Sequence, residues 1–446
     1  MSQGLTAQLA ERSAALEYGA LPADIRAVAR QAILDWFAVT LAGSREPLAS
    51  IIAEEAANEG GKGAATLVGR HATAPPLLAA LVNGTTSHAL DYDDVHLSYI
   101  GHPTVAVLPA ILALGEAINA SGRDILAAYV AGYETLCRVG VAVAPGHYAM
   151  GFHATATAGS FGAAAACARL LRLDPKHTAM ALGIAATEAA GLKSMFGTMC
   201  KPLHAGKAAE NGLLAARLAA KGFTSRPDAI ECAQGFAATH GPDFDAAAAL
   251  ADPPGGWYTR GNLFKYHAAC YLTHAPIECA REITRQSGFD AAHVREIVLT
   301  IDRGADKVCN IVKPTTGLEA KFSLRFTVAL ALAGIDTARL GTYSDERTTE
   351  PRLKTLADMV RIEFVDGWES SRATLGVTLE GGRKFSAAHD SGIPAADVAA
   401  QGRRIDEKFT SLAIPVLGEA AAQRLREAVA MLDELRSVRE LMTLAG

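Results

Sequence analysis

The sequence predicts a mainly α-helical protein, with a large all-helical domain and a smaller second domain of the α+β class. Apolar segments with helical spacing fill the first 265 residues, whereas alternating, β-branched segments occur only after them. The helical pattern returns near residue 393, and a chain of 446 residues exceeds one ordinary domain. We therefore expect a helical domain over 1–265, an α+β domain over 266–392, and C-terminal helices over 393–446 that return to the first domain.

Several helices of the first domain are predicted from the spacing of their apolar residues. Residues 6–57 are expected to be helical, and the segment 21–43 has Pro22 near its start and Gly43 at its end, as helices often do. The later segments are apolar around most of their circumference, which is typical of buried helices. These segments are 75–90, 102–122, 123–143, 156–173 and 174–191.

The second domain is predicted to mix strands and helices. Residues 294–303 alternate and are rich in β-branched side chains, so we expect a strand there, followed by a helix over 318–334. Three further strands with glycine-containing turns are expected to form a β-meander. They are "VRIEFVD" (360–366), "SRATLGVTLEGG" (371–382) and "RKFSAAHD" (383–390). The segments 394–412 and 419–442 are then expected to be helical.

Composition narrows the class of protein. Half of the residues are apolar and 20% are charged, which favours a globular chain. The net charge is −5 and no basic run occurs, so no nucleic-acid partner is expected. The seven cysteines include no CxxC pair, which favours reduced thiols and a cytoplasmic protein. The N-terminus lacks the pattern of a signal peptide, the apolar runs are shorter than a membrane span, and no membrane contact is expected.

Four stretches place polar side chains in apolar, glycine-rich surroundings. They are "HALDYDDVHLSYIGHP" (88–103), "APGHYAMGFHATATAG" (144–159), "GLKSMFGTMCKPLHAGKAAENG" (191–212) and "GNLFKYHAACYLTHAPIECA" (261–280). Taken singly, each has an ordinary explanation, because aspartates often lie in turns or cap helices and lone histidines often lie in a core. Four such stretches in one chain indicate a shared site.

The third stretch supports a more specific inference about Lys201. Pro202 suits the first turn of a helix, and the pattern then continues to Gly222. Lys201 is therefore expected at the N-terminus of that helix, where free N–H groups and the helix dipole attract carboxylates. A lysine at such a place can transfer a proton or hold an anion.

Metal and nucleotide chemistry have weaker support in the sequence. The first stretch contains His and Asp ligand types at positions 88, 91, 93, 94 and 96, but their spacing matches no established metal signature such as HExxH. The GxSxG motif of serine hydrolases is absent, and "GGKGAAT" lacks the spacing of a phosphate-binding loop. We expect acid–base chemistry without a metal.

At these stretches the sequence resembles the MmgE/PrpD family, which includes 2-methylcitrate dehydratase, cis-aconitate decarboxylase and iminodisuccinate epimerase. The motifs that carry the resemblance are "HALDYDD…HP", "GFHATATAGSFGAAAACARLL", "MCKPLHAGKAAENG" and "KYHAACYLTHAPIECA". The resemblance implies a helical domain with an α+β lid, a homodimer, and a cofactor-free active site in the cleft between the two domains.

The matching motif positions imply a set of site residues. The expected catalytic residues are Asp91, His102, Tyr148, His153, Lys201 and His274, and we assign substrate binding to His204, Lys207 and Lys265. Two departures concern the decarboxylase. The position where that enzyme has threonine is Val95 here, and the stretch from Asp91 to His102 is one residue longer. The chain is also shorter than typical 2-methylcitrate dehydratases.

The activities of the family share one difficulty, because negative charge builds up next to a carboxylate. An enzyme must neutralise that carboxylate and place an acid or base nearby. The expected partner is a small di- or tricarboxylate, and the leading expectation is a hydro-lyase similar to 2-methylcitrate dehydratase. The alternative is an epimerase of a small dicarboxylate, with Tyr148 opposite Lys201. A decarboxylase and a non-catalytic binding protein are the remaining interpretations.

Overall fold

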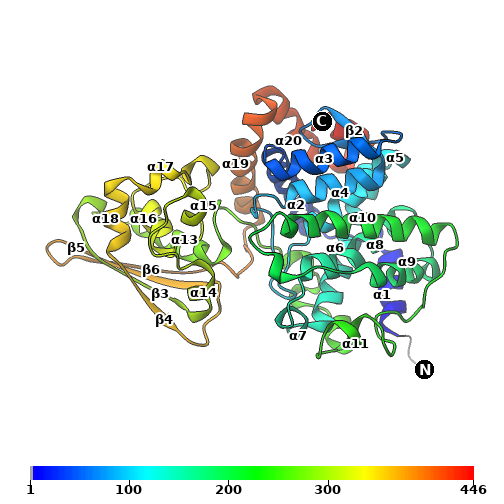
Figure 1. The fold of residues 1–446 in the computed structure, drawn as a ribbon, viewed down its shortest axis with the longest axis horizontal. Helices are drawn as coiled ribbons and strands as arrows, with labels where there is room; N and C mark the ends of the chain where they lie inside the picture. The colour runs from blue at the N-terminus through cyan, green and yellow to red at the C-terminus, as the bar shows by residue number, and fades with distance from the viewer. Residues whose placement is uncertain (1–3) are drawn as a thin grey trace. The chain divides into compact units, whose positions relative to one another are not determined.

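The computed structural model describes residues 4–446 and has two compact units. The helical unit reaches to Phe264 and includes Ala395–Gly446, and the α+β unit is Lys265–Pro394 (Figure 1). The predicted fold class, a large helical domain and a smaller α+β domain, is confirmed. Each unit is described below by itself.

The centre of the helical unit is helix α8 (Ala154–Leu170), which is buried at every position. It packs against α5 (Thr104–Ile118), α6 (Gly122–Val143) and α10 (Cys200–Ala220) (Figure 1). Its sequence is mostly Ala, Gly, Ser and Thr, and such small side chains let helices approach closely. The abundance of small residues in the sequence is therefore explained by close helix packing.

The other helices of this unit surround that centre. The segment 419–442 was expected to be one helix, but it divides after Ala430 because Ser437 starts a new helix through a capping box with Glu440. A short hairpin that the sequence did not predict, β1 (Ala65–Leu67) and β2 (Ala72–Ala74), precedes α4. The remaining helices are α1 (Leu5–Ala15), α2 (Ala23–Gly43), α3 (Pro47–Glu59), α4 (Pro76–Ser87), α7 (Gly146–Ala149), α9 (Pro175–Glu188), α11 (Phe236–His240), α12 (Ala246–Leu250), α19 (Val398–Leu417), α20 (Glu419–Ala430) and α21 (Val438–Thr443).

One helix, α6, corrects an expectation from the sequence. No apolar run was expected to reach the length of a membrane span, yet α6 has 22 residues and passes that test by length and composition. Its apolar window is 94% buried inside the protein. Such burial is typical of a core helix, which is how α6 packs against α8.

The α+β unit contains a four-stranded sheet in the order β4-β3-β5-β6. The expected meander is wrong in one respect, because β3 (Val294–Asp302) lies between β4 (Val360–Val365) and β5 (Arg372–Leu379). The pairing of β3 with β4 is parallel, so the chain must cross over between them through helices. Only β5 and β6 (Lys384–Asp390) form the expected hairpin.

Helices cover one face of this sheet (Figure 1). Helix α13 (His274–Thr284) packs on β5 and β6, and α16 (Leu324–Leu332) packs on α13. The single helix expected over 318–334 is divided into α15 (Gly317–Ala320) and α16, because the side chain of Ser323 caps the second helix. Three further short helices complete the unit. They are α14 (Asp306–Cys309), α17 (Asp345–Thr348) and α18 (Pro351–Asp358).

Candidate active site

Three parts of the helical unit bring polar side chains together. They are the loop between α4 and α5, the residues around the start of α8, and the first turns of α10. Their side chains are joined by the contacts given below. We call this group the polar cluster, and its members are His88, Asp91, Asp93, His102, His153, Lys201 and His204.

Asp91 is the partly exposed carboxylate of the polar cluster. Its Oδ1 lies 2.9 Å from Nζ of Lys201 and 3.6 Å from Nε2 of His102, and 37% of its side chain is exposed. Its φ of +49° is in the left-handed region, which aspartate tolerates better than most residues and which recurs at functional sites. An ammonium and an imidazole thus converge on one carboxylate oxygen.

Lys201 is the second residue of α10, so the sequence prediction that it stands at a helix N-terminus is confirmed. Pro202 is the third helical residue rather than the first, and Gly222 follows the helix with a positive φ of 86°. The N–H groups of Cys200, Lys201 and Leu203 are already bonded to Thr198 and Met199, so it is the dipole of the helix that adds positive potential beside the lysine. This end of α10 is therefore suited to an anionic group.

Asp93 is a buried carboxylate shared by two histidines. Its Oδ1 lies 2.8 Å from Nδ1 of His88, and its Oδ2 lies 2.8 Å from Nδ1 of His102. Burial alone would raise the pKa of Asp93, but the two imidazoles and their hydrogen bonds outweigh burial and hold that pKa well below its usual range. The carboxylate is therefore ionised. Asp93 was not among the predicted site residues.

His153 and His204 form a pair of neutral imidazoles. Their Nδ1 atoms are 3.0 Å apart, so one ring must donate the proton and the other must accept it. Burial lowers the pKa of both histidines, and the charges of His88 and Lys201 lower them further. The ring of Phe196 meets His153 edge to face at 5.0 Å. This pair offers hydrogen bonds without adding full charge.

Tyr148 lies in α7 and is held by Lys193. Nζ of Lys193 donates to the carbonyl oxygen of Tyr148 at 2.9 Å and lies 3.6 Å from the centre of its ring. Burial and the nearby charge of Asp91 raise the pKa of the Tyr148 phenol. The phenol is therefore protonated at neutral pH. Lys193 was not assigned a role from the sequence.

One predicted residue of the helical unit, Lys207, pairs outside the polar cluster. Lys207 is 49% exposed and pairs with Glu210 at 2.5 Å on the same helix. Lys265 and His274 are buried in the α+β unit. Burial lowers the pKa of His274 well below its usual value, and the charges of His267 and Lys265 act in the same direction. His274 is therefore a neutral imidazole at the first position of α13.

A divalent metal would find only part of the expected ligand set here. The ligand atoms of His88, Asp91, Asp93 and His102 lie within 4.8 Å of one another. However, Lys201 already pairs with Asp91, and a bound cation would have to displace or repel that ammonium. The other two ligand types expected from the sequence, Asp94 and His96, are bonded to other residues.

Those two candidates are His96 and Asp94. His96 Nε2 lies 3.0 Å from the carbonyl oxygen of Tyr258, and burial lowers the pKa of His96 to about 4. Asp94 accepts hydrogen bonds from the backbone N–H and the hydroxyl of Thr104. The side chains of His96 and Asp94 are therefore bonded to partners outside the polar cluster.

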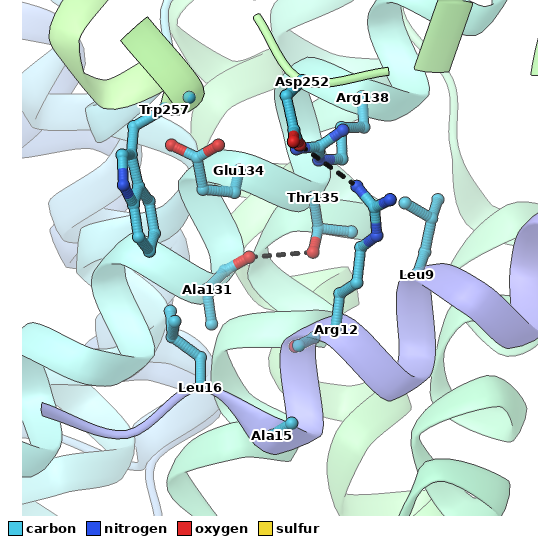
Figure 2. Close-up of a pocket in the computed structure, with 12 residues that line it drawn as sticks. Leu9, Arg12, Ala15, Leu16, Ala131, Glu134, Thr135, Arg138, Asp252 and Trp257 are labelled. Carbon is cyan, nitrogen blue, oxygen red and sulfur yellow. Dashed lines mark hydrogen bonds and ion pairs between the residues drawn. The ribbon is translucent and has the colours of Figure 1, made fainter. Parts of the chain in front are cut away.

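A separate cavity of about 340 Å³ lies in the same unit (Figure 2). It contains Arg12, Arg138, Glu134 and Asp252, together with apolar residues such as Trp257. Arg138 donates to two backbone carbonyls and pairs with Asp252 at 3.5 Å, and Glu134 accepts from the loop that follows Trp257. These charged side chains make hydrogen bonds and ion pairs within the helical unit. No member of the polar cluster lines this cavity.

The comparison with known families agrees with the motifs. The MmgE/PrpD N-terminal domain matches residues 7–248, and the MmgE/PrpD C-terminal domain matches residues 267–434. The chain belongs to the MmgE/PrpD family. Similar members of this family include a cis-aconitate decarboxylase of Aspergillus terreus, which is 26% identical over 99% of this chain and 96% of its own length. A cis-aconitate decarboxylase of Homo sapiens is 27% identical over 83% of this chain and 79% of its own length.

Proposed function

We propose that this MmgE/PrpD protein is a lyase that acts next to a carboxylate of a small di- or tricarboxylic acid. The observation that carries the proposal is the convergence of Lys201 and His102 on one oxygen of Asp91. The geometry that these two side chains present to Asp91 is also the geometry that would bind a substrate carboxylate. The names of the similar family members support the same substrate class.

Each residue of the polar cluster has a role in this proposal. Lys201, at the positive end of α10, neutralises the substrate carboxylate, so that negative charge on the neighbouring carbon is tolerated. His102 and Asp91 exchange the proton of that carbon, because they lie beside the lysine. The neutral pair of His153 and His204 donates one further hydrogen bond. No step needs a cofactor.

Tyr148 supplies the proton that decides the product. Its raised pKa keeps the phenol protonated, so it is suited to give a proton rather than to take one. Given to a leaving hydroxyl, this proton completes a dehydration, which makes a hydro-lyase similar to 2-methylcitrate dehydratase our first candidate. Given to carbon after loss of carbon dioxide, it completes a decarboxylation, which the named relatives favour as the second candidate.

Epimerisation needs Tyr148 also to act as a base, because a proton must leave one face and return to the other. Tyr148 lies close enough to Asp91 for the carboxylate to raise the pKa of the phenol. A tyrosine of raised pKa is a poor base at neutral pH, so we place the epimerase behind the two lyase reactions.

The deciding experiment is proton NMR in D₂O with the purified protein. The acids are citrate, 2-methylcitrate, cis-aconitate and iminodisuccinate, each with and without a chelator. New alkene signals from a hydroxy acid support the hydro-lyase, and loss of a carboxyl group from cis-aconitate supports the decarboxylase. Deuterium at the α-carbon with loss of optical purity and no alkene would instead support the epimerase. No change in any acid would contradict the proposed substrate class.

Replacing the lysine at the start of α10 tests the assignment within the site. Lys201→Ala is expected to lower kcat/KM for the active acid by at least about 100-fold, because charge stabilisation next to the carboxylate is lost. The matched control is Lys221→Ala, an exposed lysine just after the other end of α10. Near-normal turnover of a folded Lys201→Ala protein would contradict the assignment.

A further inference from the structure

Two histidines of the polar cluster share one carboxylate. Asp93 is fully buried, and its two oxygens each lie 2.8 Å from the Nδ1 atom of a different imidazole, His88 and His102. Nδ1 of His102 also lies 2.9 Å from the carbonyl oxygen of Asp94, which can only accept. Nδ1 of His102 must therefore carry a proton, and its Nε2 is the atom that faces Asp91.

The histidine on the other side of Asp93 lies deeper in the protein. His88 is 1% exposed, and its Nε2 has no hydrogen-bond partner among residues 4–446. Its ring lies 4.5 Å from the ring of His102 and 6.1 Å from the ring of His153. A buried imidazole without a partner for Nε2 costs stability, so its retention beside His102 calls for an explanation.

We propose that Asp93 is a positioning residue that sets the orientation and basicity of His102. His88 offsets part of the negative charge of the Asp93 carboxylate. The inference rests on the proposed function, in which His102 exchanges a proton at Nε2. A carboxylate behind the far nitrogen of an imidazole favours the protonated ring, and it fixes which nitrogen faces the reacting group. Because His88 shares the same carboxylate, the effect on His102 is moderated rather than maximal.

The charges around His102 define what the removal of Asp93 would change. Asp91 and Asp93 from its own loop favour a charged imidazole, whereas Lys201 from α10 and the imidazoles of His88 and His153 oppose it. Two further titratable groups, Asp94 and Tyr99, also interact with Asp93. Without the Asp93 carboxylate, Asp91 still faces His102 at 3.6 Å, but one of these two negative charges is gone and the balance shifts toward the neutral imidazole.

The first test compares two neighbouring substitutions. Asp93→Asn keeps the shape of the side chain but removes its charge, and we expect kcat to fall at least about 100-fold with KM changed less than about threefold. The limb of the pH–rate profile that reports histidine protonation should move to lower pH. Asp94→Asn is the matched control, because the Asp94 side chain bonds to Thr104 while its backbone carbonyl stays in place.

The second test needs no substrate. In ¹⁵N-histidine NMR spectra of the free protein, Asp93→Asn should lower the pH midpoint at which His102 titrates, and Asp94→Asn should not. His88→Gln can still donate to Asp93 but carries no charge, so it should raise that midpoint. This second variant also tests the inference if Asp93→Asn fails to fold.

The outcomes separate this inference from the proposed function. If the wild-type protein transforms no acid of the panel, the proposed function fails, and the NMR midpoints alone decide the role of Asp93. An unchanged His102 midpoint in Asp93→Asn, or equal shifts in the Asp93 and Asp94 variants, would overturn the inference. A midpoint lowered by His88→Gln would overturn the role of His88.

Discussion

At the scale of single residues, two adjacent aspartates are held in opposite protonation states. Asp93 faces two imidazoles and is ionised, whereas Asp94 has no cationic partner among the groups that set its pKa. Burial raises the pKa of Asp94 to about 8, and the charges of Asp35 and Asp93 add to that effect, although hydrogen bonds from Thr104 oppose it. Asp94 is therefore a neutral acid at neutral pH.

The protonated state of Asp94 makes stability depend on pH. Its pKa rises from 3.8 in the unfolded chain to about 8 in the folded protein. The folded protein therefore binds the proton of Asp94 more tightly than the unfolded chain does, and this adds to the free energy of unfolding. The added stability is complete below pH 3.8 and is lost as the pH rises through about 8, by up to about 1.4 kcal/mol per pH unit. Asp94→Asn mimics the neutral acid, so the variant should lose less free energy of unfolding than wild type between pH 6 and pH 9 in urea titrations.

The neighbouring position supplies the contrast for this prediction. Asp93 has a lowered pKa, so its carboxylate stabilises the fold above the ordinary range of aspartate pKa values. Asp93→Asn should therefore lower the free energy of unfolding both at pH 6 and at pH 9. An Asp94→Asn protein with the same pH dependence as wild type would contradict the assignment of a neutral Asp94.

The sequence alone could not separate these two residues. Asp93 and Asp94 are chemically identical in "DYDDVH", and their states depend on partners that arrive from other elements, such as Thr104. Lys201 was easier to predict, because its place at a helix start depends on local sequence. The hydrogen bond between His153 and His204 joins two helices, and spacing within one stretch does not predict it.

At the scale of elements, a contact between two glycines positions the polar cluster. Helices α4 and α10 cross at Gly84 and Gly206, where a Cβ on Gly84 would lie 2.7 Å from Cα of Gly206. Helix α4 leads into the loop with Asp91, and α10 begins beside Lys201. The closeness of the two backbones therefore helps to set the 2.9 Å contact between Asp91 and Lys201.

Adding one methyl group at this crossing should disturb both stability and activity. A Cβ at position 206 would lie 2.3 Å from the carbonyl oxygen of Leu81, so Gly206→Ala must push α4 and α10 apart. We expect a loss of about 1–3 kcal/mol in the free energy of unfolding, together with lower kcat/KM. Urea denaturation and the activity assay measure the two effects.

The control for this substitution is Gly19→Ala, an exposed glycine whose added Cβ would meet nothing within 4 Å. It should leave both quantities close to wild type. If Gly206→Ala were as stable and active as the control, the crossing would not position the site.

Elements were predicted more accurately than their pairing. The long helices of the first domain and all four strands of the larger sheet were expected from periodicity, which is a local property, whereas the short helices α7, α11 and α12 were not. The neighbours of β3 were not, because the strand that follows it in the sequence lies on one side and β5 lies on the other. Strand order depends on long connections, and short-range alternation carries no information about them.

At the scale of the whole molecule, a lysine near the C-terminus supports the loop of the polar cluster. Lys408 of α19 donates to the backbone carbonyl of Tyr92 at 2.7 Å and pairs with Asp35 of α2 at 2.6 Å. Its Nζ lies 4.0 Å from the centre of the Tyr92 ring, and the side chains of Lys408 and Asp35 are each 2% exposed. Tyr92 stands between Asp91 and Asp93 in the sequence, so the buried hydrogen bond from Lys408 fixes the backbone of the loop that carries both aspartates.

Removing the buried lysine should therefore weaken the fold and the site together. Lys408→Met leaves the Asp35 carboxylate buried without its cation, which costs about 3–5 kcal/mol in comparable cases. We expect a lower free energy of unfolding in urea and a lower kcat in the protein that remains folded. A second substitution, Asp35→Asn, should restore part of the stability, because the buried charge is then gone.

The loss of stability and the loss of kcat can be separated with the double variant Lys408→Met, Asp35→Asn. If the double variant regains stability but not kcat, Lys408 positions the loop through the Tyr92 carbonyl. Full activity of a folded Lys408→Met protein would contradict that role. The contact joins residues 316 positions apart, and the sequence offered no sign of it beyond the return of helical pattern after residue 393.

This distant support also has a consequence for biosynthesis. A ribosome that adds about 5–20 residues per second needs roughly 15–60 s to extend the nascent chain across the 316 positions from Tyr92 to Lys408. Throughout that interval the loop that carries Asp91 and Asp93 lacks its buried cation. The nascent protein is therefore expected to acquire its finished acid–base centre only late in translation, well after α8 and α10 have left the exit tunnel.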